Sequence, residues 1–160
     1  MIKKGFTQIE LLVSMGLLMI LIGVLTTVFG QILDVQLESK AVSSVDQNGR
    51  YILARLAYDF RSANDIVLPV NPGDTSSSLQ ISKNSVDYIY GLSSGNLTLT
   101  VGSTTENINN YAADISNLTF TRVGSGNTND TIRVGFTVTS KTQQAHGNNT
   151  KNFQTTLSIN

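Results

Sequence analysis

One carboxylate could do specific chemistry because of where it stands. Glu10 begins an apolar segment, and the only charged residues before it are Lys3 and Lys4. A carboxylate in the first turns of a membrane helix is unfavourable by about 2.5–3.5 kcal/mol if it lies deep, and by less near the interface. A group placed there despite this penalty is a candidate for function through pairing with a cation. The simpler interpretation is that the two lysines snorkel towards Glu10 and satisfy it locally.

The residue types needed for metal binding or nucleophilic catalysis are scarce. The chain has one histidine, His146, and no cysteine, which argues against a zinc site or a Cys–His nucleophile. His146 lies in the glycine- and asparagine-rich stretch 143–149 and is interpreted as a solvated loop residue. The stretch 124–130 has one carboxylate and lacks EF-hand spacing, which favours a flexible loop over a calcium site. The sequence therefore predicts no catalytic residue, no metal and no cofactor.

The element that must position Glu10 is a membrane helix. No charged residue occurs from Leu11 to Gly30. These roughly 20 residues would form a helix about 30 Å long, which matches a bilayer core. Lysines on the N-terminal side favour a cytoplasmic N-terminus with the remaining chain outside. A cleaved signal peptide is disfavoured because the apolar run is too long and no small-residue cleavage site follows it. An uncleaved signal anchor is the stronger alternative.

The first residues resemble a known processing motif. A basic leader, a glycine, an aromatic residue, a glutamate and an apolar span occur together in Gly5-Phe6-Thr7-Gln8-Ile9-Glu10-Leu11-Leu12-Val13, preceded by Lys3-Lys4. This stretch resembles the prepilin cleavage and N-methylation motif of type IV pilins, type II secretion pseudopilins and competence pilins. The resemblance implies a lollipop fold, in which a long N-terminal helix carries a small head.

The resemblance also implies roles for three residues. Gly5 would be the last leader residue, cut by a prepilin peptidase on the cytoplasmic side. Phe6 would be the first mature residue and would be methylated on its new α-amine. Glu10 would pair with that amine on a neighbouring subunit. Pairing across subunits relieves two charges that are each unfavourable near lipid, and it fixes the axial stagger of the helices.

Two positions depart from the common pattern. Main filament subunits of this family often have a proline in the middle of the membrane helix, where this chain has Thr27, and no proline occurs before Ile66. Gln8 stands where leucine is commoner. Neither change affects the predicted processing. The missing proline favours a minor subunit over the main one.

The helix is predicted to continue into an amphipathic half and end near Ala63. At 100° per residue, one arc of the helix collects the apolar side chains, namely Val42, Val45, Gly49, Ile52, Leu53, Leu56, Phe60 and Ala63. Asp46–Arg50 and Arg55–Asp59 are spaced as ion pairs on an exposed face. Possible frays are predicted near Gly30 and Gly49. Gly49 has two interpretations, a tolerated kink in the helix or the close approach of a strand.

The remainder predicts a β-rich head. Prolines, glycine and serines in 64–78 indicate a long loop, and short strands are expected at 79–81, 86–92, 97–101, 115–123, 132–139 and 153–159, with a four-residue turn at 93–96. One helix followed by antiparallel strands is an α+β fold. The predicted organisation is a leader (1–5), a membrane half of the helix (6–30), an amphipathic half (31–64) and an extracytoplasmic head (65–160).

These features together predict a structural, non-enzymatic protein. The order of elements resembles PilW-like minor pilins and GspJ-like pseudopilins. The predicted partners are a prepilin peptidase, other pilin or pseudopilin subunits and the cytoplasmic membrane, with later residence in a pilus or pseudopilus. A net charge of zero and 14% charged residues give no sign of nucleic-acid binding. The alternatives are a main filament pilin, or a signal-anchored surface module for binding or adhesion.

Overall fold

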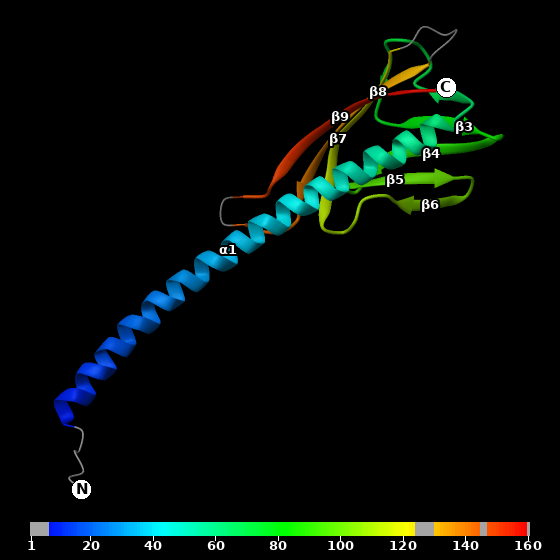
Figure 1. Ribbon diagram of the computed structural model, residues 1–160. Helices are drawn as coiled ribbons and strands as arrows, with labels where there is room; N and C mark the ends of the chain where they lie inside the picture. The colour runs from blue at the N-terminus through cyan, green and yellow to red at the C-terminus, as the bar shows by residue number, and fades with distance from the viewer. Residues whose placement is uncertain (1–6, 124–129, 145–146, 160) are drawn as a thin grey trace.

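The computed structural model describes residues 7–123, 130–144 and 147–159. The chain begins with one helix, α1 (Gln8–Arg61), of 54 residues, which is about 80 Å long at 1.5 Å per residue. Figure 1 shows its first part extending away from a β-rich head. The predicted long N-terminal helix is confirmed. The frays predicted near Gly30 and Gly49 are wrong, because α1 is unbroken at both glycines.

Both ends of α1 have local caps. Thr7 has an extended backbone, and its Oγ1 accepts a hydrogen bond from the Glu10 amide at 3.4 Å. This satisfies one of the N–H groups that a helix start leaves unpaired. At the other end the Ser62 amide donates to the Asp59 carbonyl at 3.3 Å. Arg61 lies in the last turn, where a positive charge interacts favourably with the helix dipole.

The head contains two antiparallel sheets rather than the one sheet that the sequence predicts. The first has five strands in the order β1-β3-β4-β5-β6, and the second has four in the order β2-β7-β8-β9. The strands are β1 (Asp65–Leu68), β2 (Thr75–Ser76), β3 (Leu79–Lys83), β4 (Val86–Ser93), β5 (Asn96–Val101), β6 (Thr104–Asn107), β7 (Ala113–Arg122), β8 (Thr131–Ser140) and β9 (Thr150–Ser158). The α+β class is confirmed.

Several local expectations need correction. The stretch 64–78, predicted as a loop, contains β1 and β2. The connection between β4 and β5 is tighter than predicted, because Ser93 pairs with Asn96 and only two residues turn. Ser94 and Gly95 both have positive φ, as that kind of turn requires. Strand β6 has no apolar alternation and was not predicted.

The core lies between the upper part of α1 and the two sheets. Val45, Ile52, Leu56 and Phe60 of the predicted arc are at most 1% exposed, and they pack with side chains from both sheets. Val42 is exposed, contrary to the prediction. The buried face of α1 also includes three residues outside the predicted arc, namely Ala41, Asn48 and Asp59.

Candidate functional site

The first candidate site is the N-terminal end of α1. Glu10 lies in the first turn and is exposed, and Thr7 caps the same turn. The sequence-predicted residues Gly5, Phe6, Lys3 and Lys4 lie outside the described residues, as does His146. The predicted pairing of Glu10 and the predicted cleavage therefore remain proposals. Within the described part of the chain, Glu10 has no ion-pair partner.

The lower part of α1 exposes an apolar surface on all sides. Every residue from 8 to 40 is exposed, and no charged residue occurs between Glu10 and Asp34. Helix α1 is long and apolar enough to cross a membrane. Thr26 and Thr27 satisfy their hydroxyls within the helix by donating to the Ile22 and Gly23 carbonyls, each at 2.8 Å. This arrangement leaves no side-chain donor of these two residues unpaired in lipid.

The uncovered part of α1 is longer than a bilayer needs. Among the described residues of α1 the first buried one is Ala41, so packing on the head begins there. Residues 8–40 span about 50 Å, of which a bilayer core takes about 30 Å. A stalk of roughly ten residues, which includes Asp34, Glu38 and Lys40, therefore separates the apolar span from the head.

The second candidate feature is the polar link between α1 and the loop after β6. Asn48 is 5% exposed, and its Nδ2 donates to the Ser44 carbonyl at 2.8 Å and to Asn110 Oδ1 at 3.2 Å. The Asn110 amide donates back to Asn48 Oδ1 at 2.9 Å. This reciprocal pair fixes the helix against the connection between β6 and β7.

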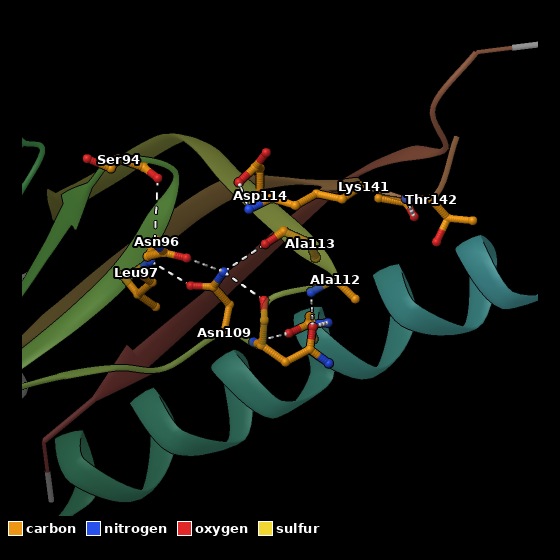
Figure 2. A network of polar contacts seen from close by, with 12 residues as sticks. Ser94, Asn96, Leu97, Asn109, Ala112, Ala113, Asp114, Lys141 and Thr142 are labelled. Atoms are coloured by element: carbon orange, nitrogen blue, oxygen red, sulfur yellow. Dashed lines mark hydrogen bonds and ion pairs between the residues drawn. The ribbon is translucent and has the colours of Figure 1, made fainter. Parts of the chain in front are cut away.

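Asn109 extends the link to the sheets. Its Oδ1 accepts from the Leu97 amide at 2.8 Å, and its Nδ2 donates to the Ala113 carbonyl at 2.8 Å. Figure 2 shows Asn109 between the start of β5 and the start of β7, with Lys141 and Asp114 forming a separate ion pair nearby. Both ends of the Asn109 amide are paired, as a buried amide needs. The loop is therefore hydrogen-bonded to α1 and to both sheets.

A buried carboxylate secures the upper end of α1. Asp59 is 1% exposed. It accepts a hydrogen bond from Arg55 Nε at 2.8 Å and a short one from the Tyr90 hydroxyl of β4. The predicted Arg55–Asp59 pair is confirmed, but its carboxylate is buried rather than on an exposed face. Burial and the Asp59 carboxylate raise the pKa of Tyr90 above its ordinary value, because both disfavour a second negative charge there.

Strand β9 fixes the middle of α1. A Cβ placed on Gly49 would lie 2.1 Å from Cζ of Phe153, so the Phe153 ring rests directly on the glycine. Of the two interpretations of Gly49, close approach of a strand is confirmed. Asp46 does not form its predicted pair with Arg50 but accepts from Lys151 Nζ of β9 at 2.7 Å. This hydrogen bond lowers the pKa of Asp46.

The sequence offered only a weak signal for these links. The asparagines Asn48, Asn109 and Asn110 stand among many others and resemble turn residues, and the Tyr90 partner of Asp59 is 31 residues away. Asn48 lies outside the predicted apolar arc, so the helical pattern gave no sign that its side chain is buried. Among the described residues, no group of three or more His, Asp or Glu side chains lies close enough to hold a metal ion.

Comparisons with protein-family models, curated proteins and solved structures found no match to this chain.

Proposed function

We propose that this chain is the precursor of a structural subunit, a minor pilin or pseudopilin, of a type IV pilus or a related secretion or uptake filament. In this proposal a prepilin peptidase cuts between Gly5 and Phe6 and methylates the new amine. The mature chain stays in the cytoplasmic membrane by its helix, with the head outside. It then joins a filament, where Glu10 pairs with the Phe6 amine of a neighbouring subunit.

The observation that carries the proposal is the division of α1. One unbroken helix has an upper part that packs one face on its own head and a lower part, residues 8–40, that nothing in the described chain covers. A simple anchor would need only about 20 apolar residues, and a carboxylate in its first turn would serve the helix start alone. Glu10 has no ion-pair partner among the described residues. Together with the uncovered helix, this supports assembly with other helices that supply a positive charge.

Three glycines support close packing of such helices. Gly16, Gly23 and Gly30 recur every seven residues, which keeps them near one face of the helix. A Cβ at any of them would meet nothing within 4 Å, so the approach to this face is open. Small residues let membrane helices come near one another. The continuous helix around Thr27, without a proline, favours a minor subunit over the main filament subunit.

Processing is the test. We expect the intact mass and N-terminal sequence of the chain, extracted from its host membrane, to show a methylated Phe6 start. A Gly5→Ala variant should stay full length. A Glu10→Ala variant should be cut normally but be absent from sheared filaments, whereas the control Glu38→Ala, which removes an acidic residue of the stalk, should be cut and assembled.

The opposite outcome has a clear meaning. If the chain in its host keeps residues 1–5, the proposal is wrong and the chain is a signal-anchored surface module. If Glu10→Ala and Glu38→Ala are both cut and both enter filaments, the processing role stands but the charge-pairing role of Glu10 is wrong.

A further inference from the structure

Strand β9 is an edge strand whose unpaired backbone groups can be identified. At one end the Ile159 amide donates to the Asp130 carbonyl, and at the other the Asn149 carbonyl accepts from Ser140, so odd-numbered residues face β8. Because antiparallel bonding alternates, the N–H and C=O groups of Asn152, Gln154 and Thr156 point away from β8. In the part of the chain that the structure describes, these outward N–H groups have no partner.

The other three sheet edges are protected, but β9 is not. Strand β2 has two residues, β6 has four and carries Glu106, and β1 has four, with a bulge and Pro69 directly after it. These are the devices by which proteins block edge pairing. Strand β9 has nine residues, no proline, an unshifted ladder with β8 and one charge, Lys151, which is bound to Asp46 of α1. It is an open template for another strand.

A groove lies alongside the distal half of this edge. It has a volume of about 230 Å³ and is lined by Ala57, Phe60 and Arg61 of α1 and by Thr156–Ser158 of β9. Arg61 is exposed, and among the described residues it has no ion-pair partner. A strand added to β9 would therefore place a side chain in a groove that has an unmatched positive charge.

The direction of β9 limits what can pair with it. Lys151 contacts Asp46, Phe153 contacts Gly49, and Leu157 lines the groove with Phe60, so β9 runs in the same direction as α1 (Figure 1). Antiparallel pairing of β9 with β9 of a second copy would make the two helices antiparallel. Their apolar segments would then lie at opposite ends. Two copies anchored in one membrane cannot pair in this way.

We propose that the β9 edge binds an extended strand from a different protein of the same membrane assembly. We take the strand to run antiparallel to β9 because that pairing is the more stable one per residue; it then runs from the end of the head farthest from the lower part of α1 back towards it. It hydrogen-bonds to Asn152, Gln154 and Thr156 and places an acidic side chain against Arg61. This inference rests on the membrane anchoring proposed above, but the surface is separate from the helix-mediated assembly and does not depend on cleavage after Gly5.

Hydrogen exchange of the full chain tests the proposal residue by residue. Exchange is carried out in host membranes, or in sheared filaments where these form, and compared with the detergent-extracted chain. We expect the amides of Gln154 and Thr156 to exchange at least about tenfold more slowly in the host sample. The amides of Phe153 and Thr155, already bonded to β8, should change much less. Equal exchange of Gln154 and Thr156 in the two samples would overturn the proposal.

Two variants separate edge binding from folding. Gln154→Pro removes an outward donor without removing a bond to β8, and Arg61→Glu reverses the charge in the groove. Both should lose the slow exchange at Thr156 while the head keeps its melting temperature in detergent. The matched control Arg133→Glu reverses an exposed charge on β8 and should keep the slow exchange at Thr156. If Arg61→Glu retains full protection, the acidic partner is wrong. If Gln154→Pro also retains it, the edge itself is not the binding surface.

Discussion

The two parts of α1 have the same backbone conformation and opposite surroundings. Residues 8–40 contain no buried side chain, whereas the part from Ala41 to Arg61 buries eight residues against the sheets. The glycines show the contrast most directly. Gly16, Gly23 and Gly30 have open space where a Cβ would be, while Gly49 supports the ring of Phe153.

This contrast separates what the chain completes by itself from what it leaves to others. The upper part of α1 has apolar cover and satisfied polar links from Asn48 and Asp59, so its packing on the sheets needs no partner. Nothing in the described chain covers the lower part, so in the proposed function lipid or other helices provide its apolar cover. Substitutions in the upper part should therefore change the stability of the head, and matched substitutions in the lower part should not.

The largest effect is expected at the buried carboxylate. Asp59→Ala leaves the Tyr90 hydroxyl and the Arg55 guanidinium without their acceptor, and should lower the free energy of unfolding of the head by about 3–5 kcal/mol. Thermal unfolding in detergent, followed by circular dichroism, measures it. Glu10→Ala in the lower part is the control and should leave the melting temperature unchanged. A similar small shift of the melting temperature in both variants would contradict the contrast between the two parts of α1.

Gly49 and Gly23 test the contrast with one identical change. Gly49→Ala forces the Phe153 ring to move and should destabilise the head by about 1–3 kcal/mol. Gly23→Ala adds a methyl group to open space and should leave the head unchanged. The double variant Gly49→Ala/Phe153→Ala should be less destabilised than the sum of the two single variants, because the clash is removed. Additive losses would mean that the ring does not rest on Gly49.

The raised pKa of Tyr90 predicts that the head loses stability at alkaline pH. Its pKa is raised in the folded head, so the unfolded chain releases this proton first, at a pH of about 10. The contribution of the protonated Tyr90 to the stability of the head is complete below that pH. It is lost as the pH rises, by up to about 1.4 kcal/mol per pH unit. The free energy of unfolding, measured with urea at pH 9, 10 and 11, should fall more steeply with pH for the natural chain than for Tyr90→Phe. Parallel slopes would show that Tyr90 is not shielded.

The smallest effect is expected at the surface pair between α1 and β9. The Lys151 hydrogen bond lowers the pKa of Asp46, so the pair stabilises the head at neutral pH and loses its effect as the pH falls through the range below about 4. The melting temperature of Asp46→Asn should therefore be slightly below that of the natural chain at pH 7. Near pH 2 the two melting temperatures should be equal. A gap that persists at acidic pH would show that the side chain acts through packing instead.

The sequence predicted best where one signal was strong. The long helix follows from an uninterrupted apolar run and an apolar arc, and the strands around Phe120 and Val134 follow from clean alternation. Strand β6 has four exposed polar residues, so no alternation exists to find. The second sheet was missed because strand order depends on pairing between distant segments, which periodicity does not report.

Some residues of the candidate site could be predicted from the sequence and others could not. The position of Glu10 in the first turn of a long apolar helix follows from local pattern alone. The burial of Asp59 does not, since the spacing to Arg55 is typical of an exposed ion pair and the deciding partner, Tyr90, comes from β4. The edge groove beside Arg61 likewise forms only when the last strand lies along the first helix.

That closure of the last strand on the first helix orders events in time. The contact of Lys151 with Asp46 joins residues 105 positions apart, so it cannot form until β9 has been made. Because synthesis starts at the N-terminus, α1 exists long before β9, so the part of its upper face that β9 covers stays open until that strand has been made. A chain interrupted before β9 would display that face, and quality-control proteases could recognise it as unfinished.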